Sequence, residues 1–488
     1  MRQLTAFDTQ FLRVETATTA AHLAGIAILD PAPAITRECL LKLLRDRIHL
    51  APPLRLRLAA VPFGLDHPYW TEDQDLDLGR HVHEVTLPTP GDDRQLADEV
   101  ARLHRRRLDR GRPLWEMHLI HGLSGGRVAL YTKVHHCAVD GVSGAEILAA
   151  LLDLSPEPGT PAGPAPAPDP LRAPDPLRML AGAVTRSITH PARAVRSLAR
   201  AAGELDAMPL TSTLPGAGLV ARTARSLNRL VTGGTGHPAP TLPPAPVPRT
   251  PFNGRISADR AFSYGSLPLD DVKQIAKAFG ISVNDLVMAL CSSALRTWLR
   301  RRDALPELPL VAAVPVAVRS AKGTRTVGNQ ISAMITPLAT HIACPKERLH
   351  TIQQTMRTAK RRFAMSPATW LHELSALVPA PLAGVTTAGL ATLASVAFPP
   401  INLIISNVPG PQFPLYLCGA RVRSYYPLSV LTDLSGGINI TCFSYDDSLN
   451  FGIIACPRRA PGSGQLIGHL REAMDELVTL AEAEFPQP

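Results

Sequence analysis

Proline is distributed very unevenly along this chain, and its positions limit where compact bodies can form. Of the 47 prolines in 488 residues, 19 lie between Pro156 and Pro251, mostly in two tracts at 155–176 and 237–248. Proline lacks a backbone N–H and has a fixed φ, so such tracts favour extended, semi-rigid connectors over helices or sheets. The sequence therefore predicts an N-terminal body, a linker and a C-terminal body, at residues 1–155, 156–250 and 251–488.

The predicted linker carries two short helical patterns and most of the net positive charge. The patterns cover residues 177–205 and 219–231, and between 171 and 231 nine arginines face three acids, a net charge of +6 out of +9 for the chain. Basic amphipathic helices bind anionic membrane surfaces, but such arginines also form solvated faces of packed helices, and both interpretations remain open. Nucleic acid is not expected as a partner, because aromatic residues make up only 5% of the chain and none lies among these arginines.

The rest of the composition is typical of a globular protein in a reducing compartment. Hydrophobic residues form 45% and charged residues 19% of the chain, which fits neither a disordered protein nor one with many membrane spans. The seven cysteines are odd in number and form no CxxC pair, and charged side chains interrupt the apolar N-terminal residues. Neither disulfides nor a secretory signal is therefore expected, and we expect a cytoplasmic protein.

The longest uncharged stretch, between Glu373 and Arg421, contains a segment at 376–398 that is long enough to span a bilayer. This segment consists largely of Ala, Thr and Gly, with prolines nearby, and is only weakly apolar. A buried core helix is therefore the favoured interpretation.

Both bodies combine strand-like and helical patterns. In the N-terminal body, a β-like run at 127–134 precedes a helical pattern at 144–154. In the C-terminal body, the strand-like segments are 310–318, 401–405, 438–443 and 449–455, and the helical ones are 267–279, 284–301 and 465–484. Such mixed elements predict an α+β fold rather than a barrel.

The segment 134–146, VHHCAVDGVSGAE, carries the strongest chemical signal. Successive side chains of a strand point to opposite faces, so only one of His135 and His136 can enter a given cleft. Asp140 and Gly141 form a turn in which glycine supplies a positive φ, and a capping box then starts the next helix. Imidazole titrates near neutrality, so a histidine here could take a proton from an alcohol as the alcohol attacks an acyl carbon.

Other chemical interpretations of this segment are weaker. A zinc site needs a third ligand at metal spacing, whereas adjacent strand histidines diverge and neither Cys137 nor Asp140 completes a recognisable pattern. A serine hydrolase elbow needs GxSxG, and the sequence around Ser143 lacks the last glycine. Elsewhere, glycines at 323–328 have P-loop spacing, but Asn329 replaces the lysine. Two histidines at a strand end are by themselves most often structural, so the prediction depends on the whole HHxxxDG string.

HHCAVDG (135–141) resembles the active-site motif of the CoA-dependent acyltransferase superfamily, which includes chloramphenicol acetyltransferase and the condensation domains of peptide synthetases. Further segments are similar to those of the bacterial wax ester synthase/diacylglycerol acyltransferase family over nearly the whole chain. They are LTAFDTQFLRVE (4–15), RPLWE (112–116), FNGRIS (252–257), VND (283–285), PVAVRS (315–320), GNQIS (328–332), SNVPGP (406–411) and GGINITCFSY with LNFGI (436–453). The DFGWG motif of the superfamily is absent and SNVPGP occupies the corresponding region, which favours this family.

The resemblance implies two chloramphenicol-acetyltransferase-like halves that form a pseudo-dimer, with one active site at their interface, entered by CoA and by the acceptor from different sides. It implies that His136 is the general base that deprotonates the acceptor hydroxyl, which attacks the acyl-CoA thioester directly, without an acyl-enzyme. His135, Asp140 and Gly141 complete the catalytic motif; in such enzymes the aspartate holds its geometry, often through an arginine, and the glycine serves the turn. No metal or cofactor is implied, because acyl-CoA is a co-substrate.

Asn284, in VND, lies at the start of a helical pattern next to Ser282, a predicted cap. Its amide and the positive helix end could stabilise a developing oxyanion. An ordinary polar residue of the first helical turn also fits this position. The residues 113–115 are expected to build the core or the wall of an acyl channel.

These observations predict an acyl-CoA:diacylglycerol O-acyltransferase that makes triacylglycerol, and wax esters from long-chain alcohols, peripherally at a membrane or lipid-droplet surface. The uncharged segment 376–398 would line a tunnel for the acyl chain. One alternative is a condensation-type acyltransferase that uses a carrier-protein thioester, which no adjacent carrier domain supports. The other is a catalytically silent, lipid-binding paralogue that docks on membranes through the arginine-rich linker, and the intact HHxxxDG motif argues against it.

Overall fold

The computed structural model describes residues 2–32, 34–139, 144, 147, 150–157, 171–189, 247–317, 331–365 and 401–485. Most of the basic linker, the segment 376–398, the cap at Ser143 and the glycines at 323–328 lie outside these residues. All seven cysteines are unpaired, which confirms that none forms a disulfide.

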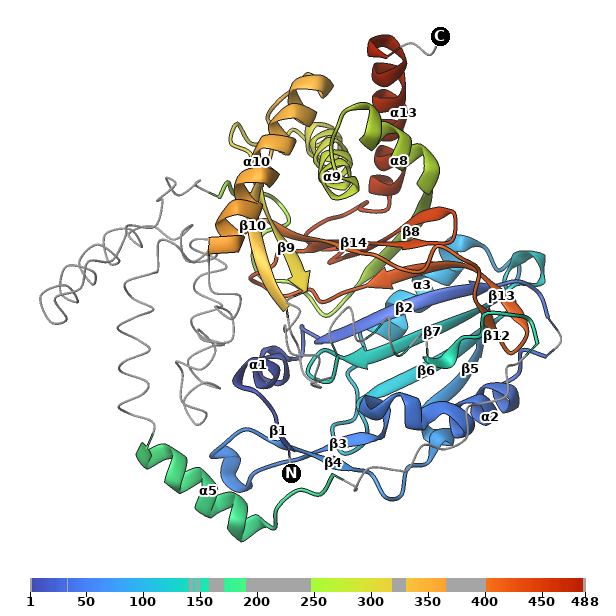
Figure 1. Cartoon of the computed structure of the whole chain (residues 1–488), viewed down its shortest axis with the longest axis vertical. Coiled ribbons are helices and arrows are strands. Elements are labelled where there is room, and N and C mark those ends of the chain that lie inside the picture. Colours follow the sequence, from blue (N-terminus) through green and yellow to red (C-terminus); the bar gives the residue numbers. More distant parts are fainter. Residues whose placement is uncertain are drawn as a thin grey trace, which may run out of the picture.

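Two six-stranded sheets form the body of the chain (Figure 1). The first contains β2 (His22–Leu29), β5 (Val82–Thr86), β6 (Trp115–His121), β7 (Val128–His135), β12 (Tyr416–Leu417) and β13 (Ala420–Leu428), in the order β12-β13-β2-β7-β6-β5. The second contains β8 (Ala261–Pro268), β9 (Leu310–Ala317), β10 (Ile331–Leu338), β11 (Leu403–Val408), β14 (Ile438–Tyr445) and β15 (Ser448–Ala455), in the order β10-β9-β11-β14-β15-β8. A short third sheet has the order β1 (Arg2–Gln3), β4 (Tyr69–Glu72), β3 (Leu56–Ala59).

Helices pack on both large sheets. The N-terminal half has α1 (Ala6–Val14), α2 (Arg37–Arg47) and α3 (Asp93–His104), with α5 (Pro176–Thr189) beyond it and 3-10 turns η1 (Ile48–Leu50), η2 (Pro52–Arg55), η3 (Pro62–Gly64), η4 (Leu78–Arg80) and η5 (Ser124–Gly126). One face of the second sheet is covered by α8 (Leu269–Ala278), α9 (Val283–Arg300), α10 (Pro345–Met365) and α13 (Gln465–Glu484) (Figure 1). This architecture confirms the predicted α+β class with two similar bodies.

Most of the predicted elements are present at nearly the predicted positions. The strand expected at 127–134 is β7, and the helix expected at 284–301 is α9. Ser282 caps α9 as predicted, because its hydroxyl accepts the N–H of Asp285 and the Asp285 carboxylate accepts the N–H of Ser282. Of the helix expected at 144–154, the described residues 144, 147, 150 and 151 are helical.

The helix expected at 267–279 begins two residues late, because its first residues complete a strand. Residues 261–268 form the edge strand β8 alongside β15, and α8 starts only at Leu269. Leu267 lies near the end of the strand and Leu269 begins the helix, and both are buried. A short apolar run of this kind fits either element, so the sequence does not mark the boundary between them.

Two strands of the C-terminal half belong to the sheet of the N-terminal half. β13 pairs with β2, and β12 pairs with β13, so residues 416–428 extend the first sheet at its edge. Asp153 ties this extension to the N-terminal half, because its backbone exchanges two 2.8 Å hydrogen bonds with Tyr416. The first sheet therefore combines strands from both halves of the chain.

The two sheets approach each other closely at Gly452 of β15. A Cβ atom at this position would lie 1.8 Å from the carbonyl oxygen of Pro427 in β13, so only glycine fits here. Around this contact, a shared core joins the halves with Ile26 and Tyr131 from the first sheet and Ile454 from the second.

The RPLWE segment contributes to the core of the N-terminal half. Leu114 and Trp115 are each 1% exposed, and the indole N–H of Trp115 donates to the carbonyl of Leu54 at 2.8 Å. Of the two predicted roles for this segment, core or channel wall, the structure therefore shows the core. Within the described ranges, no single helix is long and apolar enough to cross a membrane, and only the pair α8 and α9, bent by 100°, passes that test together by length and composition.

Candidate active site

Strand β7 delivers the two histidines of HHxxxDG to its C-terminal end. His135 is the last strand residue and pairs with His22 of β2, and the chain then turns at residues 136–138. Both imidazoles are buried, with exposed fractions of 1% for His135 and 8% for His136. Their rings meet different neighbours, Glu15 for His135 and Phe11 for His136, which confirms that the two side chains diverge.

The imidazole of His136 lies flat against Phe11 of α1. The ring centroids are 3.9 Å apart and the planes differ by 3°. The backbone N–H of His136 also donates to the carbonyl of Ala21 at 2.8 Å, so both its main chain and its ring are held. Stacking covers the face of an imidazole but leaves the nitrogens at its edge for hydrogen bonds in the plane, which a general base requires.

The contacts of His135 define which of its nitrogens carries the proton. The backbone N–H of Cys137 donates to His135 Nδ1 at 3.1 Å, so Nδ1 is an acceptor and the proton of the neutral ring is on Nε2. His135 Nε2 lies 3.6 Å from Glu15 Oε1. The ring of His135 therefore contacts the buried carboxylate of Glu15, whereas the ring of His136 contacts Phe11.

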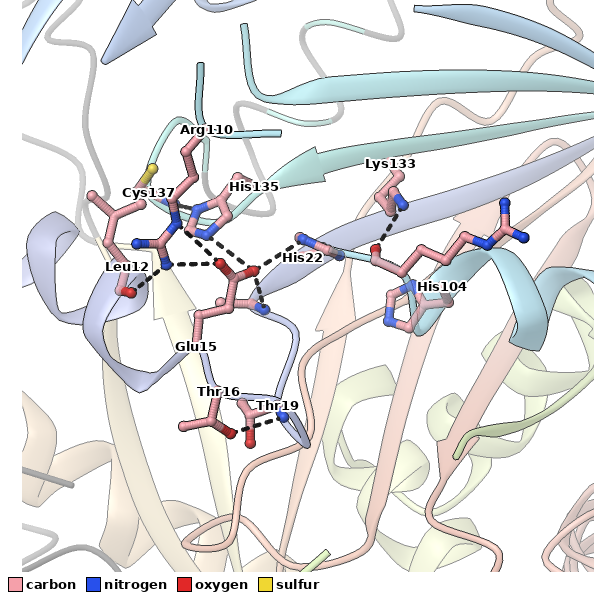
Figure 2. A network of polar contacts seen from close by, with 12 residues as sticks. Leu12, Glu15, Thr16, Thr19, His22, His104, Arg110, Lys133, His135 and Cys137 are labelled. Carbon is pink, nitrogen blue, oxygen red and sulfur yellow. Dashed lines mark hydrogen bonds and ion pairs between the residues drawn. The ribbon is translucent and has the colours of Figure 1, made fainter. Parts of the chain in front are cut away.

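Glu15 joins several elements around this carboxylate (Figure 2). Its Oε2 accepts from Arg110 Nη2 at 2.7 Å and from Arg110 Nε at 3.2 Å, and its Oε1 accepts from the N–H of Ala21 at 3.4 Å. His22 Nε2 lies 3.2 Å from the same Oε1. Arg110 also donates to the carbonyl of Leu12 at 2.5 Å, at the end of α1.

The charges of this network follow from burial and from Arg110. Burial alone would raise the pKa of Glu15, but hydrogen bonds from His135, His22 and Arg110 hold that pKa well below its ordinary value. Burial lowers the pKa of His22 to about 4, against the hydrogen bond to Glu15, and also lowers the pKa of His135. At neutral pH, an ionised Glu15 therefore pairs with Arg110 and faces two neutral histidines.

Asp140 and Gly141 lie outside the described residues, so their predicted roles stay predictions. Cys137 next to the histidines is fully buried, and burial raises the pKa of its thiol well above the ordinary value. Within the part of the chain that the structure describes, no group of three His, Cys, Asp or Glu side chains could hold a metal ion.

Asn284 lies in the first turn of α9, where the sequence predicted it. Its Oδ1 accepts from the side-chain amide of Asn407 at 3.4 Å. Asn407 belongs to SNVPGP at the end of β11, and the Cys442 thiol donates to its Oδ1 at 3.3 Å. The side-chain oxygen of Asn284 is therefore engaged by Asn407 in the first turn of α9, the positive end of that helix.

The sequence alone did not indicate that Glu15, His22, Arg110 and Asn407 belong to the hydrogen-bond networks of this site. Glu15 ends the LTAFDTQFLRVE motif and Asn407 lies within SNVPGP, so two of the four were inside segments already singled out. Their partners are far away in the sequence, and local patterns carry no signal for such pairs.

Comparison with known proteins identifies both halves of the chain as parts of one protein family. The wax ester synthase/diacylglycerol acyltransferase catalytic domain matches residues 4–287, and the C-terminal domain of the same proteins matches residues 327–478. A Mycobacterium tuberculosis protein named "Probable diacyglycerol O-acyltransferase tgs2" is 34% identical over 474 residues, covering 96% of this chain and 97% of its own length. The "O-acyltransferase WSD" of Acinetobacter baylyi is 31% identical over 483 residues, covering 97% and 96%.

Solved structures agree with the fold. The wax ester synthase/diacylglycerol acyltransferase from Marinobacter aquaeolei VT8 matches with a TM-score of 0.68 and 31% identity, covering 99% of this chain and 100% of that one. The starter condensation domain of the rhizomide synthetase RzmA matches with a TM-score of 0.54 at 15% identity, covering 100% and 95%, a likeness of fold alone.

Proposed function

Because this chain belongs to the wax ester synthase/diacylglycerol acyltransferase family, we propose that it makes triacylglycerol by transferring a long-chain acyl group from acyl-CoA to diacylglycerol, and wax esters when a long-chain alcohol is the acceptor. The chain is an O-acyltransferase. The observation that carries the proposed mechanism is the position of His136, at a strand end, stacked on Phe11 and separate from the His135–Glu15 pair.

His136 acts as the general base in this mechanism. A ring nitrogen of His136 takes the proton of the acceptor hydroxyl while the hydroxyl oxygen attacks the thioester carbonyl carbon, and the carbonyl oxygen becomes an oxyanion. The amide of Asn284 donates to that oxyanion. Collapse of the tetrahedral intermediate breaks the carbon–sulfur bond, and the CoA thiolate leaves with the proton from His136. The products are an ester and free CoA, and no acyl-enzyme forms.

The remaining motif residues support this geometry. Glu15 and Arg110 hold His135 and the end of α1, and α1 carries the Phe11 ring that fixes His136. Asp140 is proposed to maintain the shape of the turn and Gly141 to permit it. The reaction needs acyl-CoA as co-substrate and neither a metal nor another cofactor.

A peripheral position at a membrane or lipid droplet, on its cytoplasmic side, fits the lipid substrates. Phe63 in η3 is 90% exposed and Leu177 in α5 is 79% exposed, and both lie beside a small apolar cluster that contains Val61 and Met179. Arg178 follows Leu177 and is also exposed. Exposed apolar side chains with a neighbouring cation suit insertion at the level of lipid headgroups.

The test is neutral lipid synthesis by the purified protein, with palmitoyl-CoA and either diacylglycerol or a long-chain alcohol. We expect His136→Ala to lose about 10² to 10⁴ in kcat, as for removal of a general base. His341→Ala, an exposed histidine, is the matched control and should retain the wild-type rate. Absence of acyl transfer by the wild type would contradict the function, unchanged turnover in His136→Ala would contradict the base, and the ratio of the two products measures acceptor preference.

A further inference from the structure

A hollow of about 180 Å³ lies where the two halves meet, beside the loop that follows Glu15. Its walls come from three segments of the chain and contain three arginines. They are the loop 16–20, Arg105 and Arg107 after α3, and Ala258 and Arg260 before β8.

The loop 16–20 connects this hollow to the active site. Thr16 and Thr19 lie beside Glu15 in Figure 2, and the next residue after the loop is Ala21, whose carbonyl accepts the N–H of His136 at 2.8 Å. A ligand in the hollow would therefore contact the same short loop that holds the general base.

Arg260 brings a positive charge into this hollow, and none of the ion pairs among the described residues involves its side chain. Its guanidinium is largely buried and donates only to backbone carbonyls: to Thr18 at 2.6 Å, Ser257 at 2.6 Å and Asp259 at 2.9 Å. Burial lowers its pKa. The nearby Asp433 is engaged elsewhere, because its Oδ1 accepts the N–H of Ile256 at 2.9 Å. Asp259 and Asp433 raise this pKa again through their charges, but among the described residues no carboxylate oxygen hydrogen-bonds to the guanidinium. A phosphate that did so would stabilise the buried charge.

The other two arginines add to this charge. Arg105 lies 3.2 Å from Asp259, and both side chains are at least half exposed, so this pair is weak. Arg107 is exposed and has no hydrogen-bond or ion-pair partner among the described residues. Thr16 and Thr18 also line the hollow, and their hydroxyl oxygens lie 3.2 Å from each other.

A second hollow of about 470 Å³ continues from Arg107 toward the active site, and its acids are already paired. Glu15 pairs with Arg110 at 2.7 Å, Glu116 with Lys133 at 3.1 Å and Asp109 with Arg112 at 3.4 Å. Arg107 lines both hollows, so the three arginines lie next to the hollow that Glu15 lines.

The geometry points to a phosphate-binding site formed by Arg105, Arg107, Arg260 and the loop 16–20, which holds the phosphate groups of the acyl-CoA donor. Guanidinium groups and hydroxyls bind phosphate oxygens through charge-assisted hydrogen bonds, and acyl-CoA is the substrate here that carries phosphates. This inference rests on the proposed function for the identity of the ligand. The negative charge of the ligand, by contrast, is inferred from the three arginines of the hollow alone.

The experiment compares two thioester donors in the full-length protein. Palmitoyl-CoA carries the phosphates, and S-palmitoyl-pantetheine has the same reacting end without them. We expect Arg107→Ala to raise the KM for palmitoyl-CoA about tenfold more than the KM for palmitoyl-pantetheine, the effect of losing one charged phosphate contact. Arg107→Lys should recover part of this loss. Arg94→Ala, an exposed and unpartnered arginine near the start of α3, should leave both values as in the wild type.

Direct binding tests the site separately from catalysis. Adenosine 3′,5′-bisphosphate, the phosphate-bearing end of CoA, should bind the wild type in titration calorimetry and bind Arg107→Ala about tenfold more weakly, with an affinity that falls as salt is added. If the wild type transfers acyl groups from neither thioester, the proposed function fails, and this titration still decides whether the phosphate site exists.

Two results would overturn the inference. One is an equal effect of Arg107→Ala on both thioesters, together with unchanged binding of adenosine 3′,5′-bisphosphate. The other is that Arg107→Ala weakens binding to vesicles containing phosphatidic acid, relative to phosphatidylcholine vesicles, while the KM for palmitoyl-CoA stays at the wild-type value. The arginines would then bind lipid headgroups rather than the coenzyme.

Discussion

The ring of Phe11 and the imidazole of His136 are stacked 3.9 Å apart and nearly parallel, so an aromatic residue of α1 determines the plane of the proposed general base. A base transfers protons along the plane of its ring, so this contact decides the direction in which His136 can accept a proton. If His136 is the base, Phe11 is therefore a positioning residue, although it carries no reactive group.

Removing this ring should slow the chemical step more than substrate binding. Stacked aromatic pairs contribute roughly 0.5–1.5 kcal/mol, so we expect Phe11→Ala to lower kcat by about tenfold at most, with a smaller change in KM. Phe11→Tyr keeps the ring and is the matched control. Steady-state rates with palmitoyl-CoA check this, and equal kcat values for Phe11→Ala and the wild type would contradict the positioning role.

The parts of this site that could be predicted from sequence are those that depend on neighbouring residues. The alternation of side chains in a strand predicted that His135 and His136 diverge, and the helical pattern with Ser282 as its cap predicted the start of α9. The structure contains both features because each depends on interactions within about four residues.

The parts that could not be predicted depend on contacts between distant residues. Glu15 follows α1 and His135 ends β7, so their contact joins residues 120 positions apart, and β13 pairs with β2, which lies about 400 residues earlier. A strand pattern shows that a segment is extended but not which strand it pairs with. The last two residues of the edge strand β8 were predicted as the start of a helix for a related reason, since short apolar runs fit both periodicities.

Loss of the Glu15 carboxylate should destabilise the fold. In Glu15→Gln, Arg110 loses a charged acceptor inside a buried network, and we expect the free energy of unfolding to fall by about 2 kcal/mol. Glu84→Gln is the matched control, because Glu84 makes an exposed contact with His121 at 3.2 Å and should change the stability by less than about 0.5 kcal/mol. Denaturant titrations measure both, and an equal loss for the two variants would contradict a special role for Glu15.

Acid should destabilise the protein well above the pH at which carboxylates titrate. The pKa of His22 is lowered to about 4, so below its ordinary value of about 6.5 the unfolded chain binds a proton that the folded chain does not. Stability is therefore lost as the pH falls, by up to about 3 kcal/mol from His22 between pH 6.5 and 4. His135, whose pKa is also lowered by burial, adds in the same direction.

Unfolding free energies measured from pH 4.5 to 7.5 test the contribution of His22. The quantity compared is the slope of the free energy of unfolding against pH. We expect His22→Gln to reduce this slope by up to about 1.4 kcal/mol per pH unit, the contribution of one proton. His341→Gln changes an exposed histidine and should retain the wild-type slope. Parallel curves for His22→Gln and the wild type would mean that His22 is not held neutral by the fold.

Removing the exposed apolar side chains should weaken attachment to lipid surfaces. We expect the double substitution Phe63→Ser and Leu177→Ser to reduce the fraction of protein that sediments with liposomes about tenfold or more, because each large apolar side chain contributes roughly 1.5–3 kcal/mol when buried. Phe413→Ser is the matched control, because Phe413 is 50% exposed and lies in the other half of the chain. Equal losses with the control would show that exposure alone, not this position, determines binding.

The hydrogen bond from Asn407 to Asn284 should be detectable as a non-additive effect on catalysis. Asn284→Ala removes the proposed oxyanion donor, and we expect kcat to fall by about 10² to 10³. Asn407→Ala leaves the donor but not its orientation, so the loss should be nearer tenfold. Because Asn407 acts only through Asn284, Asn407→Ala should lower kcat hardly any further when Asn284 is already alanine, and the double-mutant cycle measures that coupling.

Asn253→Ala is the control. It loses side-chain hydrogen bonds to Ile401 and Asn402 in the same half, and its effect should combine additively with that of Asn284→Ala. Additive losses for both pairs would show that Asn407 does not orient Asn284.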